Sequence, residues 1–185
     1  MIFVLSGPGG AGKGAICSGV VARDDRILLS RSWTTRGRRD GEPADAYRFV
    51  DRAMFEAEIQ RGGFLEHADV LGNWYGTPLP TQAAQEDRRD LLLEINVEGA
   101  RQIRVRYDSA VIIFVVAPSH TELAARMRRR GDPAPAIDRR LRLAVDEDEI
   151  GRALADHVVI NDDLERAVDE TLAVIAKARQ AAGRA

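Results

Sequence analysis

The chain lacks several features that mark secreted, metal-binding and membrane proteins. Cys17 is the single cysteine among 185 residues, so no intramolecular disulfide can form, and we expect a buried, inert thiol. The three histidines, His67, His120 and His157, do not have the spacing of a zinc site. No apolar run is long enough to cross a membrane, and no basic segment precedes the first run. We therefore expect a cytoplasmic protein with no membrane contact and no structural metal.

An excess of charge of one sign is also missing. The formal net charge is -2 at pH 7, with 27 Lys and Arg against 29 Asp and Glu. Without a basic surplus the chain has no global field to hold a nucleic-acid backbone, so we expect no nucleic-acid partner. A length of 185 residues suits one domain with one sizeable core and small inserted pieces.

Glycine is concentrated in one stretch near the N-terminus. Residues 7–14 read Gly-Pro-Gly-Gly-Ala-Gly-Lys-Gly and follow the apolar run 2–5 directly. A glycine-rich turn between a strand and a helix lets backbone N–H groups curl around an anion, and Lys13 adds a mobile ammonium. The spacing is that of a P-loop. We therefore expect ATP to bind along one continuous stretch: Gly7, Pro8, Gly9, Gly10, Ala11, Gly12, Lys13, Gly14 and Ala15.

Strand-like and helix-like segments alternate along the rest of the chain. The apolar runs typical of strands are residues 2–5, 91–95, 111–116 and 157–160. The helical patterns are residues 98–106, 121–130 and 164–182. Such alternation indicates a parallel sheet covered by helices on both faces. Residues 32–81 are polar and aromatic, which predicts a small, mostly antiparallel insertion, and the Arg-rich stretch 128–136 predicts a mobile connection between two helices.

The insertion carries side chains suited to a second phosphate. Arg36 and Arg39 stand three residues apart, with Tyr47 and Tyr75 further along the same segment. Guanidinium forks match phosphate oxygens in a bidentate way, and phenols add donors. The arginines belong to the motif T-T-R-x-x-R-x-G-E. Further motifs follow in order: F-L-E, G-N-x-Y-G-T, L-E-I-x-V-E-G-A, A-P-S, R-x-x-x-R-G, I-x-x-R-L-x-x-A-x-x-E and V-V-I-N-D-D-L. With the P-loop in front of them, the chain resembles the guanylate kinases over nearly its whole length.

The resemblance implies an α/β fold of the P-loop NTPase type. We expect a parallel sheet flanked by helices, a small mixed or antiparallel GMP-binding insertion and a short helical lid. It also implies one guanylate-kinase-like domain over residues 1–185. The core of this domain comprises residues 1–31, 82–125 and 147–185, the insertion comprises residues 32–81, and the lid comprises residues 126–146.

The resemblance also implies a GMP site within the insertion and next to it. The GMP phosphate should contact Arg36, Arg39, Tyr47 and Tyr75, with Glu42 orienting the arginines. The base should be surrounded by Ser32, Glu66, Thr77 and Asn96. A carboxylate at Glu66 can accept from both N1–H and the exocyclic amine of guanine, whereas adenine offers neither donor on that edge. Simpler interpretations exist for single residues, because Glu42 and Glu66 can also be solvated strand charges.

For the ATP half, the resemblance adds lid arginines and a residue near the adenine. Those residues are Arg126, Arg130, Arg140 and Asn161. The implied catalytic side chains are Lys13, Arg36, Arg130 and Arg140. Phosphoryl transfer needs little covalent help, so we expect positioning, Mg²⁺ and converging positive charge to carry catalysis. The metal ligands stay unknown at this point, and residues 128 and 129 are interpreted as a solvated helix face.

Four departures from the family pattern concern the site. Neither Gly14 nor Ala15 offers the hydroxyl usually found beside the P-loop lysine. The segment 42–47 is one residue short, which changes the placement expected for Tyr47. Asn96 replaces an acidic residue, and Asp132 stands where Thr is common. Since Mg²⁺ keeps several waters, it tolerates the loss of one protein oxygen.

The sequence thus predicts an ATP-dependent kinase of purine nucleotide metabolism that phosphorylates GMP, and also dGMP. One alternative is a catalytically weak guanylate-kinase-like binding module, favoured by Ala15 and Asn96 but disfavoured by an intact Lys13. Another is a related P-loop kinase acting on a phosphorylated sugar, because proteins of the same fold can act on different substrates. Glu66 and Ser32 disfavour it, since a sugar phosphate has no base to read. Monomer and homo-oligomer are equally compatible with the sequence.

Overall fold

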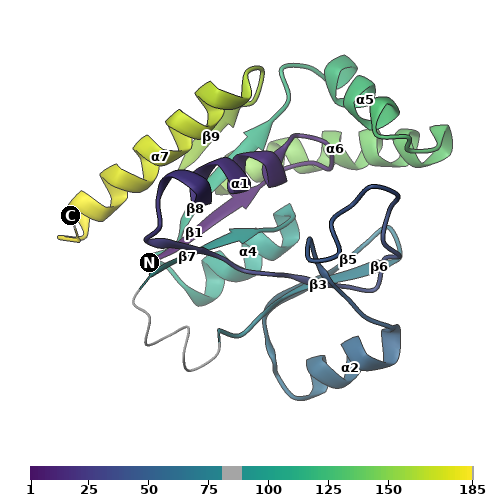
Figure 1. Ribbon diagram of the computed structural model, residues 1–185, viewed down its shortest axis with the longest axis horizontal. Helices are drawn as coiled ribbons and strands as arrows, with labels where there is room; N and C mark the ends of the chain where they lie inside the picture. Colours follow the sequence, from purple (N-terminus) through teal and green to yellow (C-terminus); the bar gives the residue numbers. More distant parts are fainter. Residues whose placement is uncertain (81–88, 185) are drawn as a thin grey trace.

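The computed structural model describes residues 1–80 and 89–184. Its central layer is a five-stranded parallel sheet in the order β2-β7-β1-β8-β9 (Figure 1). The strands are β1 (Ile2–Ser6), β2 (Ile27–Leu29), β7 (Asp90–Glu94), β8 (Val111–Val116) and β9 (His157–Ile160). Four of them coincide with the apolar runs, which confirms the predicted parallel sheet. β2 has no counterpart among those runs, because three residues are too few to show a pattern.

Helices cover both faces of this sheet. α1 (Lys13–Arg23) and α7 (Leu164–Ala181) lie on one face, and α4 (Val97–Arg106) and α6 (Ala134–Leu154) lie on the other (Figure 1). Side chains of β1 alternate accordingly: Phe3 and Leu5 join the core under α1 and α7, whereas Val4 joins the core under α4. Cys17 is fully buried on α1, as expected, and burial raises the pKa of its thiol.

The insertion forms a second, smaller sheet in the order β4-β3-β6-β5. Its elements are β3 (Trp33–Thr34), β4 (Arg48–Phe49), α2 (Arg52–Gln60), β5 (Phe64–Val70) and β6 (Asn73–Pro78). The β3–β6 and β5–β6 pairs are antiparallel and the β3–β4 pair is parallel, so the sheet is mixed. Trp33, Phe55 and Phe64 form its core. The sequence pattern does not reveal α2, because Phe55 is its one buried residue.

α5 (His120–Arg129) packs against the first half of α6 around Leu123, Met127 and Ile137, and the expected lid, residues 126–146, lies within these two helices and their connection. The irregular stretch expected at 128–136 is shorter than predicted, since α5 continues to Arg129 and α6 begins at Ala134. Proline is tolerated at this start because the first helical N–H groups need no intrahelical partner. α6 runs without a break through the expected lid boundary at residue 146.

Of the other expected boundaries, the one between residues 31 and 32 falls between β2 and β3, the one between residues 125 and 126 falls inside α5, and the one between residues 81 and 82 lies outside the described residues. Among the residues that the structure does describe, no helix combines the length and the apolar composition that a bilayer crossing requires.

Candidate active site

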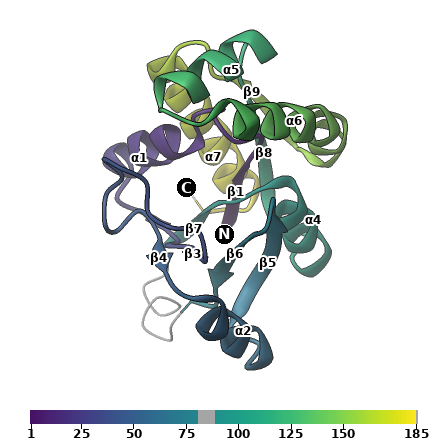
Figure 2. The ribbon, with the colours of Figure 1, turned by 90° about the vertical axis from the view of Figure 1, so that its right-hand side faces the viewer.

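A cleft of about 890 Å³ brings together the P-loop, the insertion and the lid. Figure 2 shows α5 and α6 in the upper part of the view and β5, β6 and α2 in the lower part. The predicted residues that line the cleft are Gly7, Gly9, Gly10, Gly12, Lys13, Gly14, Ala15, Ser32, Arg36, Arg39, Glu42, Tyr47, Glu66, Tyr75, Asn96, Arg126, Arg130 and Arg140. Pro8, Ala11, Thr77 and Asn161 are not part of this wall.

The P-loop joins the end of β1 to the start of α1. Gly7 has φ 139°, and a Cβ there would lie 2.1 Å from the Val115 carbonyl oxygen of the neighbouring strand, so only glycine fits. Gly12, with φ 95°, is the N-cap of α1 and provides no side-chain cap. The first N–H groups of α1 are therefore available to an anion. The Lys13 ammonium folds over the loop and donates to the carbonyls of Gly7 at 2.6 Å and Pro8 at 3.2 Å.

Arg126 and Asn161 hold the P-loop from its outer side. The Asn161 side-chain amide donates to the Ala11 carbonyl at 2.8 Å and is buried. Arg126 donates to the same carbonyl at 3.2 Å and to the Asn161 carbonyl at 2.7 Å, and pairs with Glu122. These contacts fix the loop against α5 and the end of β9. Arg126 keeps a place on the cleft wall, whereas Asn161 lies behind it.

Glu42 organises the two arginines of the insertion. It accepts two hydrogen bonds from the Arg36 guanidinium, at 2.7 and 3.0 Å, and one from the Arg39 backbone N–H at 3.0 Å. Burial alone would lower the pKa of Arg36, but the hydrogen bond to Glu42 and the charge of Tyr75 outweigh it, so the pKa is raised. The buried Arg36 Nε has no hydrogen-bond partner among the described residues.

Both predicted tyrosines stand beside Arg36. Its guanidinium carbon lies 5.5 Å from the centre of the Tyr47 ring, and the Tyr47 and Tyr75 rings are 6.0 Å apart. Arg31 fastens the short loop by donating to the carbonyls of Ala44 and Tyr47. The missing residue in segment 42–47 therefore does not keep Tyr47 away from Arg36.

Glu66 is a buried carboxylate that faces the cleft from β5. It is 2% exposed and accepts from both the backbone N–H and the hydroxyl of Thr77, at 2.9 and 2.6 Å. Thr77 thus lies behind Glu66 and contributes through it. Burial raises the pKa of Glu66 to about 7, against the lowering effect of the Thr77 hydrogen bonds. Asn96 is the N-cap of α4, and its side-chain oxygen accepts from Gly99 N–H, which leaves its amide hydrogens for a ligand.

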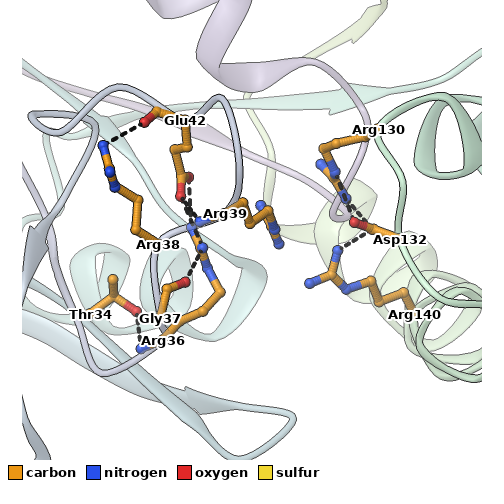
Figure 3. A network of polar contacts seen from close by, with 9 residues as sticks. All are labelled: Thr34, Arg36, Gly37, Arg38, Arg39, Glu42, Arg130, Asp132 and Arg140. Carbon is orange, nitrogen blue, oxygen red and sulfur yellow. Dashed lines mark hydrogen bonds and ion pairs between the residues drawn. The ribbon is translucent and has the colours of Figure 1, made fainter.

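Two lid arginines meet at one carboxylate. Arg130 donates to Asp132 through Nε and Nη2, and Arg140 donates to Asp132 through Nη1 at 2.7 Å (Figure 3). Figure 3 also shows the Arg39 side chain reaching from the insertion toward this group. The cleft is therefore lined with arginines on both sides, and each side carries a carboxylate among them.

Comparison with known proteins agrees with this geometry. The family model described as guanylate kinase matches residues 1–178. The guanylate kinase of Thermus thermophilus is 44% identical over 187 aligned positions, which cover 99% of this chain and 84% of the relative. The chain belongs to the guanylate kinase family. The crystal structure of guanylate kinase from Anaplasma phagocytophilum superposes with a TM-score of 0.77 at 32% identity and covers 96% of this chain and 85% of its own.

A more distant likeness shows the fold alone. Shikimate kinase from Acinetobacter baumannii, solved in complex with shikimate, has a TM-score of 0.52 at 13% identity and covers 95% of this chain and 93% of its own. The α/β fold is thus shared beyond the guanylate kinases, in agreement with the predicted fold class.

This guanylate kinase places two further carboxylates beside Lys13 that the sequence analysis did not single out. Glu94 ends β7 next to the P-loop, and a Cβ on Gly14 would lie 3.3 Å from its carboxylate. Glu147, on α6, also lines the cleft. Burial raises the pKa of both, and the charge of Lys13 opposes the rise. Both residues lie inside motifs that carried the resemblance, L-E-I-x-V-E-G-A and I-x-x-R-L-x-x-A-x-x-E, so the signal was present there.

Mg²⁺ fits this kinase site as an ion held mainly by phosphates and water. Within the described residues, no cluster of three or more Asp, Glu, His or Cys side chains can hold a metal by itself. Mg²⁺ usually keeps several waters and takes one or two carboxylates plus substrate phosphates, which matches Glu94 and Glu147 near Lys13. The Ser18 hydroxyl, one turn after Gly14, is exposed and donates to the Gly14 carbonyl at 2.9 Å. This hydroxyl is therefore bonded to its own helix.

Proposed function

We propose that this protein transfers the γ-phosphoryl group of ATP to GMP, giving ADP and GDP, with ATP in the P-loop and GMP against the insertion. The observation that carries the proposal is the pairing of two phosphate-binding groups across one cleft. Lys13 and the N-terminus of α1 form the first, and Arg36 and Arg39 form the second. Glu66 lies in the same cleft wall, in a position to read the base.

The GMP half of the cleft combines a phosphate clamp with a base reader. Glu42 accepts from two nitrogens of Arg36 and so fixes the guanidinium at the cleft, with Tyr47 and Tyr75 alongside. Glu66 in its ionised form accepts from N1–H and the exocyclic amine of guanine. Thr77 holds that carboxylate in place.

Two smaller groups complete the GMP site. Ser32 and the amide hydrogens of Asn96 are the donors for the remaining acceptors of the base. These contacts concern the phosphate and the base, so we infer that dGMP is also a substrate.

The ATP half combines the P-loop with the lid. The glycines and the N-terminus of α1 surround the phosphates, Lys13 leaves its carbonyl partners for them, and Arg130 and Arg140 add positive charge from the lid. Arg126 and Asn161 fix the loop, next to the expected place of the adenine. Bound Mg²⁺ supplies charge neutralisation at the phosphates, and Glu94 and Glu147 are the residues that would hold it through its waters.

Catalysis by these residues consists of positioning and charge. No side chain needs to form a covalent intermediate, because direct transfer requires the two phosphates in line and donors around the moving group. We infer that the insertion and the lid approach each other over both nucleotides and exclude water, since the two halves of the site lie on separate elements.

A substrate panel tests the proposal. Formation of ADP from Mg·ATP is measured with GMP, dGMP, AMP, CMP, UMP and ribose 5-phosphate as acceptors in a coupled assay. We expect activity with GMP and dGMP and at most about a hundredth of it with AMP, since adenine leaves the carboxylate of Glu66 without donors. Equal rates with GMP and AMP, or turnover of ribose 5-phosphate alone, contradict the assignment of the base site.

A further inference from the structure

Asp132 is a nearly enclosed carboxylate beside the cleft. It lies in the connection between α5 and α6, and its side chain is 8% exposed. Its oxygens accept from Arg130 at 3.2 and 2.5 Å and from Arg140 at 2.7 Å, so one carboxylate binds the C-cap residue of α5 and an arginine within α6 (Figure 3). The position is also one of the four departures from the family pattern.

The donors that Asp132 does not use remain available at the cleft. Arg130 gives Nε and Nη2 to Asp132 and keeps Nη1, whereas Arg140 gives Nη1 and keeps Nε and Nη2. Within the part of the chain that the structure describes, these remaining groups donate to no other acceptor, and both arginines line the cleft. A phosphate can therefore reach both arginines while Asp132 stays in place.

The insertion repeats this arrangement with different residues. Glu42 accepts the Arg36 guanidinium in a bidentate way, through Nη1 and Nη2. Asp132 also accepts the Arg130 guanidinium in a bidentate way, but through Nε and Nη2, so that Nη1 is the nitrogen left over. Bidentate carboxylate pairs fix the plane of a guanidinium, so each carboxylate determines where the free N–H groups point.

Charge makes such a carboxylate necessary on the lid. Burial and the charges of Arg36, Arg130 and Arg140 lower the pKa of Arg39, whereas Asp132 opposes this effect. Burial alone would raise the pKa of Asp132, but its hydrogen bond with Arg130 and the charges of Arg130 and Arg140 outweigh burial and lower it. Asp132 is therefore ionised at neutral pH. Without its negative charge, Arg130 and Arg140 repel each other and Arg39, and they turn toward water.

We propose that Asp132 is a positioning residue that holds Arg130 and Arg140 together as one phosphate-binding unit, directed at the triphosphate of the nucleotide bound in the P-loop. The proposal depends on the functions proposed above for the two arginines. Asp132 itself does not touch the nucleotide. It acts through the arginines by neutralising one of their two charges and fixing their orientation before the nucleotide arrives, which lowers the cost of ordering them.

The test compares Asp132→Asn with Asp148→Asn. The first change keeps the shape of the side chain and removes its charge. The second removes the charge of Asp148, which forms an exposed ion pair with Arg152 further along α6, outside the cleft. We expect Asp132→Asn to lower kcat/KM for ATP by about tenfold or more, with kcat contributing to the loss. GMP affinity, measured by calorimetry without ATP, should stay within about twofold. Asp148→Asn should match the unchanged protein in all of these values.

A double-mutant cycle separates positioning from a structural function. If Asp132 acts through the arginines, Asp132→Asn should cost less in an Arg140→Ala background than alone, because part of the unit is already missing. Asp132→Glu should recover most of the loss, since it restores the charge. Independent, additive losses in the cycle contradict the proposal. If Asp132→Asn does not fold, the Glu variant and the Asp132→Ser variant give the same comparison.

Two outcomes overturn the proposal without touching the proposed function. Tighter ATP binding by Asp132→Asn would mean that the carboxylate competes with phosphate for the arginines. Unchanged ATP kinetics of Asp132→Asn, together with strong losses in Arg130→Ala and Arg140→Ala, would mean that the arginines need no positioning. If instead the two arginine variants are themselves unimpaired, the proposed lid function fails, and this inference fails with it.

Discussion

Lowering the pH from 8 to 6 is expected to weaken GMP binding by about tenfold through Glu66 alone, because only the ionised carboxylate accepts from both guanine donors. Burial raises the pKa of Glu66 to about 7. The raised pKa places the change between pH 6 and pH 8. Since Glu66 belongs to the GMP half of the cleft, GMP affinity should decline more steeply than ATP affinity.

The magnitude follows from the ionised fraction. With a pKa of about 7, the fraction of ionised Glu66 is roughly 0.9 at pH 8 and roughly 0.1 at pH 6. Only the ionised fraction binds GMP well, so the ratio of about ten corresponds to about 1.4 kcal/mol. GMP binding at pH 7 should also release about half a proton from this group.

Titration calorimetry measures both quantities. Kd is determined between pH 6 and 8, and proton release is obtained from buffers with different ionisation enthalpies. The phosphate of GMP also titrates in this range, with a pKa near 6. Glu66→Gln provides the matched control. In this variant the titration of the GMP phosphate still contributes to the pH dependence of Kd, whereas the titration of Glu66 no longer does. Between pH 8 and pH 6, Kd for GMP should rise about tenfold more in the unchanged protein than in the Glu66→Gln variant. Identical pH dependence of the two proteins would refute the reasoning.

Three other predictions concern the P-loop and the insertion. Lys13→Ala should lower kcat by about a hundredfold or more while GMP affinity by calorimetry stays unchanged, and retained turnover would remove the P-loop lysine from the mechanism. Glu42→Gln should raise KM for GMP by about tenfold and leave KM for ATP unchanged, because it weakens the hydrogen bonds that hold Arg36. Equal increases in both KM values would refute the assignment of Glu42 to the GMP half. Ala15→Thr should raise kcat or lower the Mg²⁺ requirement by no more than about tenfold, by restoring one hydrogen bond of roughly 1.4 kcal/mol. A neutral Ala15→Thr with a damaging Ser18→Ala would favour Ser18 as the substitute, although its hydroxyl is bonded to Gly14.

Long apolar strands were predictable from the sequence because parallel strands buried on both faces leave continuous runs. This applies to β1, β7, β8 and β9. The short strand β2 and helix α2 were not predictable in this way. β2 has three residues, and α2 buries only Phe55, so neither leaves a periodic pattern. Tertiary contacts decide both of them.

The features of the site also differ in how far the sequence alone revealed them. Spacing alone pointed to the P-loop, because strand, glycines and lysine are local in the sequence. The pairing of Arg36 with Glu42 spans six residues and was implied by the resemblance. The position of Thr77 behind Glu66 depends on the register of β5 against β6, which no local pattern reveals. Asp132 stood out in the sequence only as a departure, since its two arginine partners come from different helices.

The central claim is that one cleft holds both nucleotides and that the phosphoryl group passes directly between them. Its most direct test uses ATP labelled with ³²P at the γ-phosphate, Mg²⁺ and GMP, with the products separated by ion-exchange chromatography. The account predicts that the label appears in the β-phosphate of GDP, in equal amount to the ADP formed, and that the Arg36→Ala variant loses this product. Label recovered mainly as inorganic phosphate, or ADP formed at the same rate without GMP, would contradict it.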